Sequence, residues 1–429
     1  MKQIILLAAL AALFNADAHA QLGKFTNKVK NKLNQKVNQR VDNRVSKTLD
    51  DGLDVVEGKK SVEAVTEKKA NTGSGSSGTS VKSYSKFDFV AGEKIIYADD
   101  FTGEEMGQLP LNWNTQGKAE LVTLEAAKGN WLRLFPVASY LTSNKEPFTK
   151  NFTVEFDLLL SMENTGYSYP YFSFGLMSSG EDDAADNKFL DGGYRKVQSA
   201  EVYLRLSSGG TTSTYMESYD RGARSFITES QQLSALEANY GKPVHFSIQV
   251  QESRLRVWVN AEKKFDLPKA LPVTEVFNNL FFRTFSSSYK EDQLGFYIAN
   301  LKIATGLPDT RHKLVEEGKF STTGILFDVN AATIKPESAG VLKEIGETLV
   351  KHGELKVNII GHTDSDGSDA ANAELSRKRA EAVKKYLEEN FKIETSRLSA
   401  EGKGESEPVG DNKTKEGKAQ NRRVEFIKQ

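Results

Sequence analysis

An arginine interrupts the apolar face of a helix that we predict near the carboxyl end of the chain, from about residue 372 to residue 389. The apolar stripe of this helix consists of Leu375, Val383 and Leu387. Arg379 lies between them at the same spacing, and a guanidinium on a core-facing stripe is costly unless an anion or a carbonyl oxygen pairs with it. The nearest obvious anion is Asp364. The two residues either form an internal ion pair or together bind a charged ligand.

Short patterned segments must hold these two residues in place. Residues 324–330 (GILFDVN) and 356–362 (KVNIIGH) are predicted strands, and Pro336 is expected to open a helix between them. Asp364 stands just past the second strand, and a polar loop leads from it into the helix that carries Arg379. The alternation of strands and helices predicts a mixed α+β domain at this end of the chain.

Five separated segments in this region carry a family pattern. They are ILFDVNAATIKPES (325–338), GHTD (361–364), NAELSRKRAEAV (372–383), RLSAEGKGESEP (397–408) and NKTKEGKAQNRRVEF (412–426). In order and spacing they resemble the C-terminal peptidoglycan-binding domain of the OmpA family, over about residues 314–429. The resemblance implies an α+β domain with the element order βαβαββ.

The resemblance also implies a ligand. In the OmpA family this domain binds the diaminopimelate side chain of the cell-wall stem peptide without covalent chemistry. Carried over by motif, Asp364 would take the ligand ammonium and Arg379 its carboxylate, and a zwitterionic amino-acid end does need an anion beside a forked cation. The same matching implies supporting polar contacts from Asn330, Asn372 and Arg422. Arg423 adjoins Arg422, and alternation along the last strand would put only one of them at the site.

The middle region, residues 84–306, changes to a period of two, which is typical of strands. Residues 152–160 alternate, and residues 244–250 and 255–259 predict a hairpin. We predict an all-β antiparallel sandwich that is jelly-roll-like and loosely resembles concanavalin-like or laminin-G-like domains. A transmembrane barrel would also alternate, but the clear patterns span about 7 residues, short of the about 9 to 11 needed to cross a bilayer.

Two segments of the sandwich could carry chemistry, glycoside hydrolysis or calcium binding, that an ordinary polar surface does not. Glu155 and Asp157 share one strand face, which resembles half of the carboxylate strand of jelly-roll endo-glucanases. The further Glu of that pattern is missing at 159–161, and retaining hydrolysis needs a second carboxylate at about 5 to 5.5 Å, so polar residues on an outer strand face are expected. In the acidic loop 181–193, a calcium site is the alternative to an exposed polar loop. The loop after Asp364, in the last domain, lacks the Gly and Glu of an EF-hand calcium site.

The amino-terminal part is predicted to contain an export signal, a helical segment and a linker. Residues 1–20 have a cation, an apolar run and an Ala-His-Ala end, which predict a secretory signal peptide. Residues 21–70 are predicted to form a basic amphipathic helical segment, either a solvated spacer or a peripheral contact with anionic membrane lipids. Residues 71–83 form a Gly/Ser-rich linker.

Composition limits the function of the whole chain. The 57 Lys and Arg residues against 58 Asp and Glu residues, a net charge of -1, disfavour a nucleic-acid partner. With Cys 0, thiolate metal sites and a lipidated cysteine are excluded, and no cofactor or metal motif emerges. We expect an exported, non-enzymatic protein of the periplasm or outer membrane. The alternatives are a carbohydrate-binding protein whose sandwich binds a glycan or a protein while the last domain only anchors it, and an envelope glycoside hydrolase.

Overall fold

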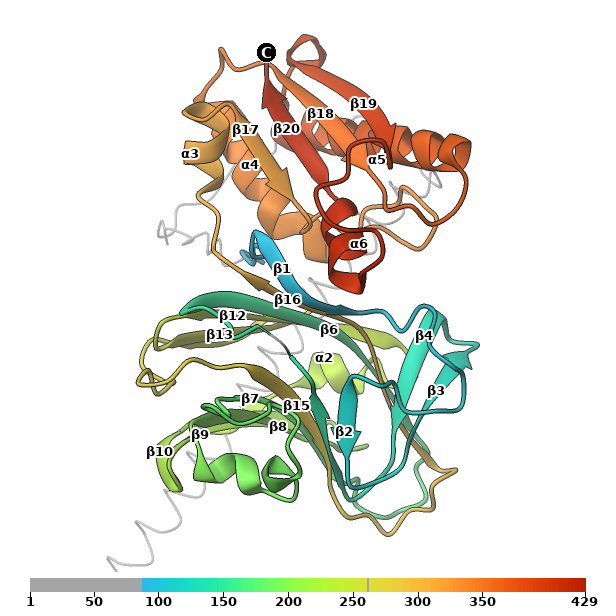
Figure 1. Ribbon diagram of the computed structural model, residues 1–429, viewed down its shortest axis with the longest axis vertical. Helices are drawn as coiled ribbons and strands as arrows, with labels where there is room; N and C mark the ends of the chain where they lie inside the picture. The colour runs from blue at the N-terminus through green and yellow to red at the C-terminus, as the bar shows by residue number, and fades with distance from the viewer. Residues whose placement is uncertain (1–86, 145, 261) are drawn as a thin grey trace, which may run out of the picture. The chain divides into compact units, whose positions relative to one another are not determined.

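The computed structural model describes residues 87–144, 146–260 and 262–429 (Figure 1). These residues belong to one compact unit of the chain. The predicted signal peptide (1–20), the basic helical segment (21–70) and the linker (71–83) lie outside the described residues. No helix in the described part of the chain combines the length and the apolar character needed to span a membrane.

Two antiparallel sheets form the middle region, as the period-two patterns predict. The first sheet contains, in spatial order, β14 (Glu262–Leu267), β13 (Arg254–Val259), β12 (Pro243–Gln251), β6 (Asn151–Met162), β16 (Leu294–Thr305), β4 (Ala127–Leu134) and β3 (Ala119–Leu124), and β1 (Lys94–Asp99) also pairs with β16. The predicted hairpin is confirmed, because β12 pairs with β13 and Ile248 lies opposite Val257.

The second sheet packs against the first through its apolar face. It contains, in spatial order, β10 (Ala223–Ile227), β9 (Ser213–Asp220), β8 (Ser199–Arg205), β7 (Tyr171–Met177), β15 (Asn279–Thr284), β5 (Ala138–Thr142) and β2 (Trp113–Thr115), and β11 (Gln231–Gln232) pairs with β9. Aromatic rings fill the space between the sheets: Phe156 of β6 stacks on Phe246 and meets Phe174 of β7 edge-on, each at 5.1 Å between ring centroids. Such contacts stabilise a core beyond the area they bury.

The outer face of β6 is not a solvent-exposed polar face, which corrects the expectation for Glu155 and Asp157. Both carboxylates are buried, because His245 of β12 and Lys302 of β16 lie beside them on the same face. A buried charge must be paired, and this network supplies the partners.

The last part of the described chain is the mixed domain. Its sheet has the order β17 (Lys319–Thr322), β20 (Val424–Lys428), β18 (Val357–His362) and β19 (Leu398–Gly404), and only β18 and β19 run parallel. Helices α4 (Ala339–Lys351) and α5 (Asp369–Phe391) cover one face of this sheet (Figure 1). Their apolar residues, among them Ile345 and Val383, share a buried core with Ile359 of β18. The predicted second strand and long helix are therefore confirmed.

Two details of the mixed domain differ from expectation. Residues 324–330 are not a strand: the first strand is β17, and the predicted segment makes one isolated bridge, Phe327 to Ile334. The chain turns back here, with Lys335 N donating to Leu326 O at 2.9 Å. The order βαβαββ also gains a short helix, α6 (Lys415–Asn421), between the last two strands.

The remaining helical elements are short. They are α2 (Ser234–Glu237), α3 (Thr310–Val315), and the 3-10 turns η1 (Asn187–Phe189), η2 (Gly193–Lys196), η3 (Pro336–Ser338) and η4 (Thr395–Arg397). Pro336 opens η3, which runs directly into α4, so the predicted helix start is confirmed.

Candidate ligand-binding site

One cavity of about 520 Å³ collects all five candidate site residues. Asn330, Asp364, Asn372, Arg379 and Arg422 all line it. Its volume falls in the range of about 300 to 1,000 Å³ that is usual for small-molecule pockets. Seven carboxylates and six Lys or Arg side chains line the cavity, so its wall offers both signs of charge. Such a wall suits a zwitterionic guest better than a singly charged one.

Two glycines bring α5 close enough to the sheet to place Arg379. A Cβ on Gly361 of β18 would lie 2.2 Å from the carbonyl oxygen of Ser376, and one on Gly402 of β19 would lie 2.3 Å from the backbone nitrogen of Arg377. Side chains at these positions would push the helix away from the sheet. The glycines therefore set the distance between α5 and the sheet, and with it the position of Arg379 at the cavity.

The guanidinium of Arg379 is held at one edge and open at the other. Its Nε donates to the carbonyl oxygen of Ala331 at 3.0 Å, and it lies over the ring of Phe327. Its two terminal nitrogens make no hydrogen bond within the described residues. Burial, followed by the charge of Arg422, lowers the pKa of Arg379. The open edge is the part of a guanidinium that can grip a carboxylate with two bonds.

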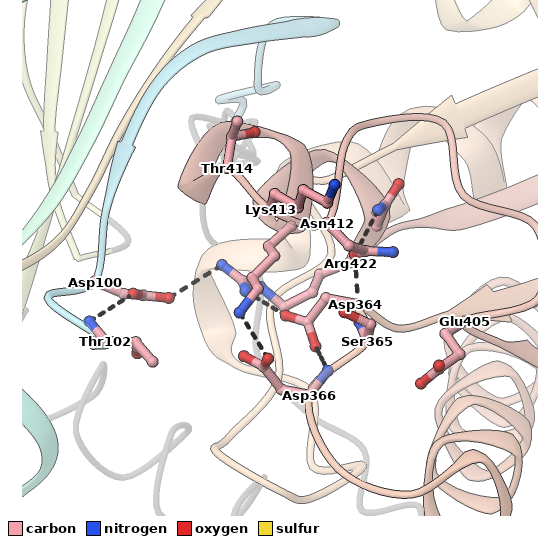
Figure 2. Close-up of polar contacts among 12 residues, drawn as sticks. Asp100, Thr102, Asp364, Ser365, Asp366, Glu405, Asn412, Lys413, Thr414 and Arg422 are labelled. Atoms are coloured by element: carbon pink, nitrogen blue, oxygen red, sulfur yellow. Dashed lines mark hydrogen bonds and ion pairs between the residues drawn. The ribbon is translucent and has the colours of Figure 1, made fainter.

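Asp364 does not pair with Arg379, so the internal ion pair is not present in the structure. Its carboxylate accepts a hydrogen bond from Nη1 of Arg422 at 2.5 Å and one from the backbone nitrogen of Asp366 at 3.2 Å (Figure 2). The Asp364 residue is only 7% exposed, yet it lines the cavity. Asp364 and Arg379 therefore contribute separately to the cavity wall.

The structure separates the two adjacent arginines. Both line the cavity, but Arg422 contacts Asp364, whereas Arg423 is buried and its Nε donates to Glu425 at 2.8 Å. Strand alternation does not apply to this pair, because both residues lie between α6, which ends at Asn421, and β20, which begins at Val424. The assignment of Arg422 to a ligand site stays a prediction.

The two candidate asparagines have different surroundings. Asn372, buried near the start of α5, donates from Nδ2 to the carbonyl oxygen of Asp364 at 3.2 Å and to Glu405 at 2.5 Å. It therefore holds the loop that carries Asp364. Asn330 is exposed at the cavity rim, in a turn where its φ is 55°, a conformation that asparagine tolerates better than most residues.

Sequence reasoning missed the part of the cavity wall that the sandwich supplies. Asp100, Asp157 and His245 line the same cavity, and His245 Nδ1 lies 2.6 Å from Asp157. Burial would lower the pKa of His245, but its hydrogen bonds to Asp157 and Glu155 outweigh burial and raise the pKa to about 10. The facing positions of Asp157 and His245 on neighbouring strands were the available signal, since both fall on the polar side of the alternation.

The chain is similar to known proteins over part of its length. Residues 326–422 match the OmpA family. Outer membrane porin F of Pseudomonas fluorescens is 43% identical over 101 residues, which is 24% of this chain and 31% of the relative. The probable lipoprotein YiaD of Escherichia coli is 41% identical over 102 residues, 24% of this chain and 46% of the relative. The crystal structure of the peptidoglycan-associated lipoprotein from Burkholderia pseudomallei shares 28% identity, covers 25% of this chain and 89% of that chain, and has a TM-score of 0.23.

The fold and the cavity thus define a small α+β domain with a charged pocket at the ends of its strands. The chain carries an OmpA family domain at its carboxyl end, residues 326–422. The matched part spans less than half the length of these two sequence relatives.

Proposed function

We propose that this protein binds peptidoglycan non-covalently, through the zwitterionic end of diaminopimelate in the stem peptide. The observation that carries the proposal is that Asp364 and the open edge of Arg379 line one cavity without being paired to each other. Membership of the last domain in the OmpA family supports the same ligand class.

Each charged group would have one task. The carboxylate of Asp364 accepts the ligand ammonium, and the two terminal nitrogens of Arg379 donate to the ligand carboxylate. Hydrogen bonds to charged groups are worth about 1.5 to 3 kcal/mol each, so the pair gives usable affinity without covalent chemistry. Asn372 keeps the Asp364 loop in place, and Asn330 and Arg422 add polar contacts at the cavity wall.

The role in the cell follows from wall binding. We propose an exported protein of the periplasm or outer membrane that links the outer membrane, or an envelope assembly, to the cell wall and carries out no catalysis. The relatives named outer membrane porin and lipoprotein support this location. The predicted basic segment, residues 21–70, would supply a peripheral membrane contact.

Co-sedimentation with purified peptidoglycan tests the proposal. Asp364→Ala and Arg379→Ala should each abolish co-sedimentation while the protein stays folded by circular dichroism, because the lost contacts are to the ligand. Arg377→Ala is the matched control: it lies on the same helix, but its guanidinium pairs with Glu374 and Glu381 on the solvent side. If both site variants sediment like the wild type, the proposed function is wrong.

A second candidate function, glycan binding by the sandwich, is favoured by the outer face of the second sheet. Val202 and Leu204 of β8 point into the core, so Tyr203 lies on the opposite face. There it stacks on Tyr215 with 4.6 Å between centroids and 5° between planes. Arg205 lies over the ring of Tyr215. Sugar rings stack on flat aromatic rings, and Tyr215 would be the stacking ring here, because it is partly exposed whereas Tyr203 is only 3% exposed.

A glycan array probed with the full chain tests this second candidate. Tyr215→Ala should remove any glycan signal, whereas Tyr167→Ala, which truncates an exposed loop tyrosine, should keep it. Absence of a glycan signal with the wild-type protein would exclude the candidate within the glycans tested.

A further inference from the structure

The cavity of the OmpA family domain is closed on one side by residues of the sandwich, among them Asp100, which lies 322 positions before Arg422. Asp100 follows the end of β1 and lines the cavity opposite Asp364. Nη2 of Arg422 lies 3.3 Å from the Asp100 carboxylate while Nη1 of the same guanidinium donates to Asp364 (Figure 2). One cation is therefore shared between two carboxylates, one from each part of the chain.

The position of Asp100 is fixed independently of Arg422. Its Oδ1 accepts a hydrogen bond from the backbone nitrogen of Thr102 at 3.1 Å. The preceding residue, Asp99, is buried and receives Trp113 Nε1 at 3.1 Å and Lys415 Nζ at 2.7 Å. Because Lys415 begins α6 and Arg422 directly follows it, the same short helix is attached to the sandwich at both ends. The distance between Asp100 and Arg422 is thus set by the fold.

The other carboxylate near this guanidinium has a cation of its own. Asp366 is paired with Lys418 at 2.6 Å. Arg422 therefore contacts two carboxylates, those of Asp100 and Asp364. Its hydrogen bond to Asp364 competes with any ligand ammonium group that binds the same oxygen atoms. If the Asp100 contact were lost, the Arg422 guanidinium would keep only its hydrogen bond to Asp364 among the described residues.

We propose that Asp100 is a positioning residue of the ligand site: it draws Arg422 toward the sandwich, so that Asp364 can accept the ammonium group of a zwitterionic amino-acid ligand. This inference rests on the proposed function of the cavity. It assigns to the sandwich a direct part in ligand selectivity, which a domain that merely adjoins the binding domain would not have.

Calorimetric titration of the full chain with free meso-diaminopimelate tests the inference. Asp100→Asn keeps an oxygen for Thr102 and removes the charge, and it should weaken binding by about three- to tenfold, the usual scale for one partly exposed charge contact. Glu93→Gln is the matched control. Glu93 pairs with Lys313 of α3 at 3.0 Å, with side-chain exposures of 36% and 31%, close to the 32% and 37% of Asp100 and Arg422. Glu93 does not line the cavity. It should bind like the wild type.

Pimelic acid, which lacks both ammonium groups, separates positioning from a structural role. Asp100→Asn should lower affinity for diaminopimelate and leave affinity for pimelic acid unchanged, and it should have no effect in an Arg422→Gln background. Equal losses for both ligands, or a loss that persists without Arg422, would overturn the inference.

An error in the role of Asp100 and an error in the proposed function give different binding results. If Asp364→Ala abolishes diaminopimelate binding but Asp100→Asn binds like Glu93→Gln, only the role of Asp100 is wrong. If the wild type does not bind diaminopimelate, or Asp364→Ala binds it like the wild type, the proposed function is wrong and the role of Asp100 is overturned with it.

Discussion

The guanidinium of Arg379 lies over the ring of Phe327, with 4.9 Å between the guanidinium carbon and the ring centroid. Phe327 belongs to the segment that we predicted as a strand and that the structure shows as a turn-back. The ring and the carbonyl oxygen of Ala331 together hold one side of the guanidinium, so that its other side is presented to the cavity.

Replacing this ring should weaken the proposed ligand contact without emptying the core. Phe327→Leu keeps an apolar side chain but removes the π face, and a cation–π contact is worth about 0.5 to 1 kcal/mol at an exposed site. We therefore expect diaminopimelate to bind about two- to fivefold more weakly in calorimetry. Thermal melting of the variant supplies the control. Unchanged affinity would show that the ring does not orient Arg379.

A lysine at position 379 should not replace the arginine. Arg379→Lys keeps the positive charge but loses the planar fork that can donate two parallel hydrogen bonds to a carboxylate. We expect affinity for diaminopimelate to fall more than tenfold, while Arg377→Lys on the solvent side of the same helix leaves it unchanged. Wild-type affinity in Arg379→Lys would mean that charge alone is sufficient.

Arg397 should be important for stability and not for binding. Its guanidinium donates to the carbonyl oxygens of Leu349, His352 and Leu355 at 2.8 to 2.9 Å, which closes the end of α4. Arg397→Ala removes three hydrogen bonds from charged nitrogens, so the free energy of unfolding should fall by about 2 to 4 kcal/mol. Urea denaturation measures the change, and co-sedimentation with peptidoglycan at low temperature should stay at the wild-type level. A variant as stable as the wild type would contradict this role.

A methyl group between α5 and β19 should also destabilise the domain. Gly402→Ala would bring its Cβ to 2.3 Å from the backbone nitrogen of Arg377, and backbone atoms cannot rotate away. Overpacking of this kind costs about 1 to 3 kcal/mol. Gly353→Ala is the control, because nothing lies within 4 Å of the added Cβ. Thermal unfolding of the two variants should separate them clearly, and equal melting temperatures would refute the close approach.

The buried network around His245 predicts a pH dependence. The pKa of His245 is raised from 6.5 to about 10, so its contribution to stability is fully present below pH 6.5 and is lost as pH rises toward 10. Burial acts to raise the pKa of Asp157, but His245 overcomes it and the pKa is lowered, so the contribution of this carboxyl fades only at acidic pH. The stability difference between wild type and His245→Gln should therefore be greatest near pH 5 to 6 and shrink above it. Urea denaturation from pH 4 to pH 10 would show this, and a difference that grows with rising pH would contradict it.

Local patterns predicted those parts of the site that depend on neighbours in sequence. The apolar stripe around Arg379 placed this residue on a core-facing helix, and the polar residue after β18 proved to be Asp364 in the same cavity. The alternative interpretation, that the two would pair with each other, rested on charge alone. The structure instead gives Asp364 a partner, Arg422, 58 residues away, and no periodicity records such a contact.

Long-range contacts account for most of what the sequence could not predict. Asp100 and Arg422 are 322 positions apart, and nothing in the residues near Asp100 marks it as part of a site. The burial of Glu155 and Asp157 has the same origin, because a strand pattern shows which side chains share a face but not what covers that face. The strand β17 was misplaced because Gly324 to Asn330 has strand-like composition, whereas the hydrogen bonds of Leu326 go to Ser338 and Lys335.

The segment from Lys415, at the buried carboxylate of Asp99, to Arg422, which follows α6 at the cavity, spans about 10 Å. A helix this short does not bend appreciably under small loads. Force on a ligand bound beside Arg422 would therefore be transmitted to Asp99 through this single rigid segment, without stretching the sheet of the last domain. If the last domain binds the cell wall as proposed, this route would distribute the force over the cores of both domains.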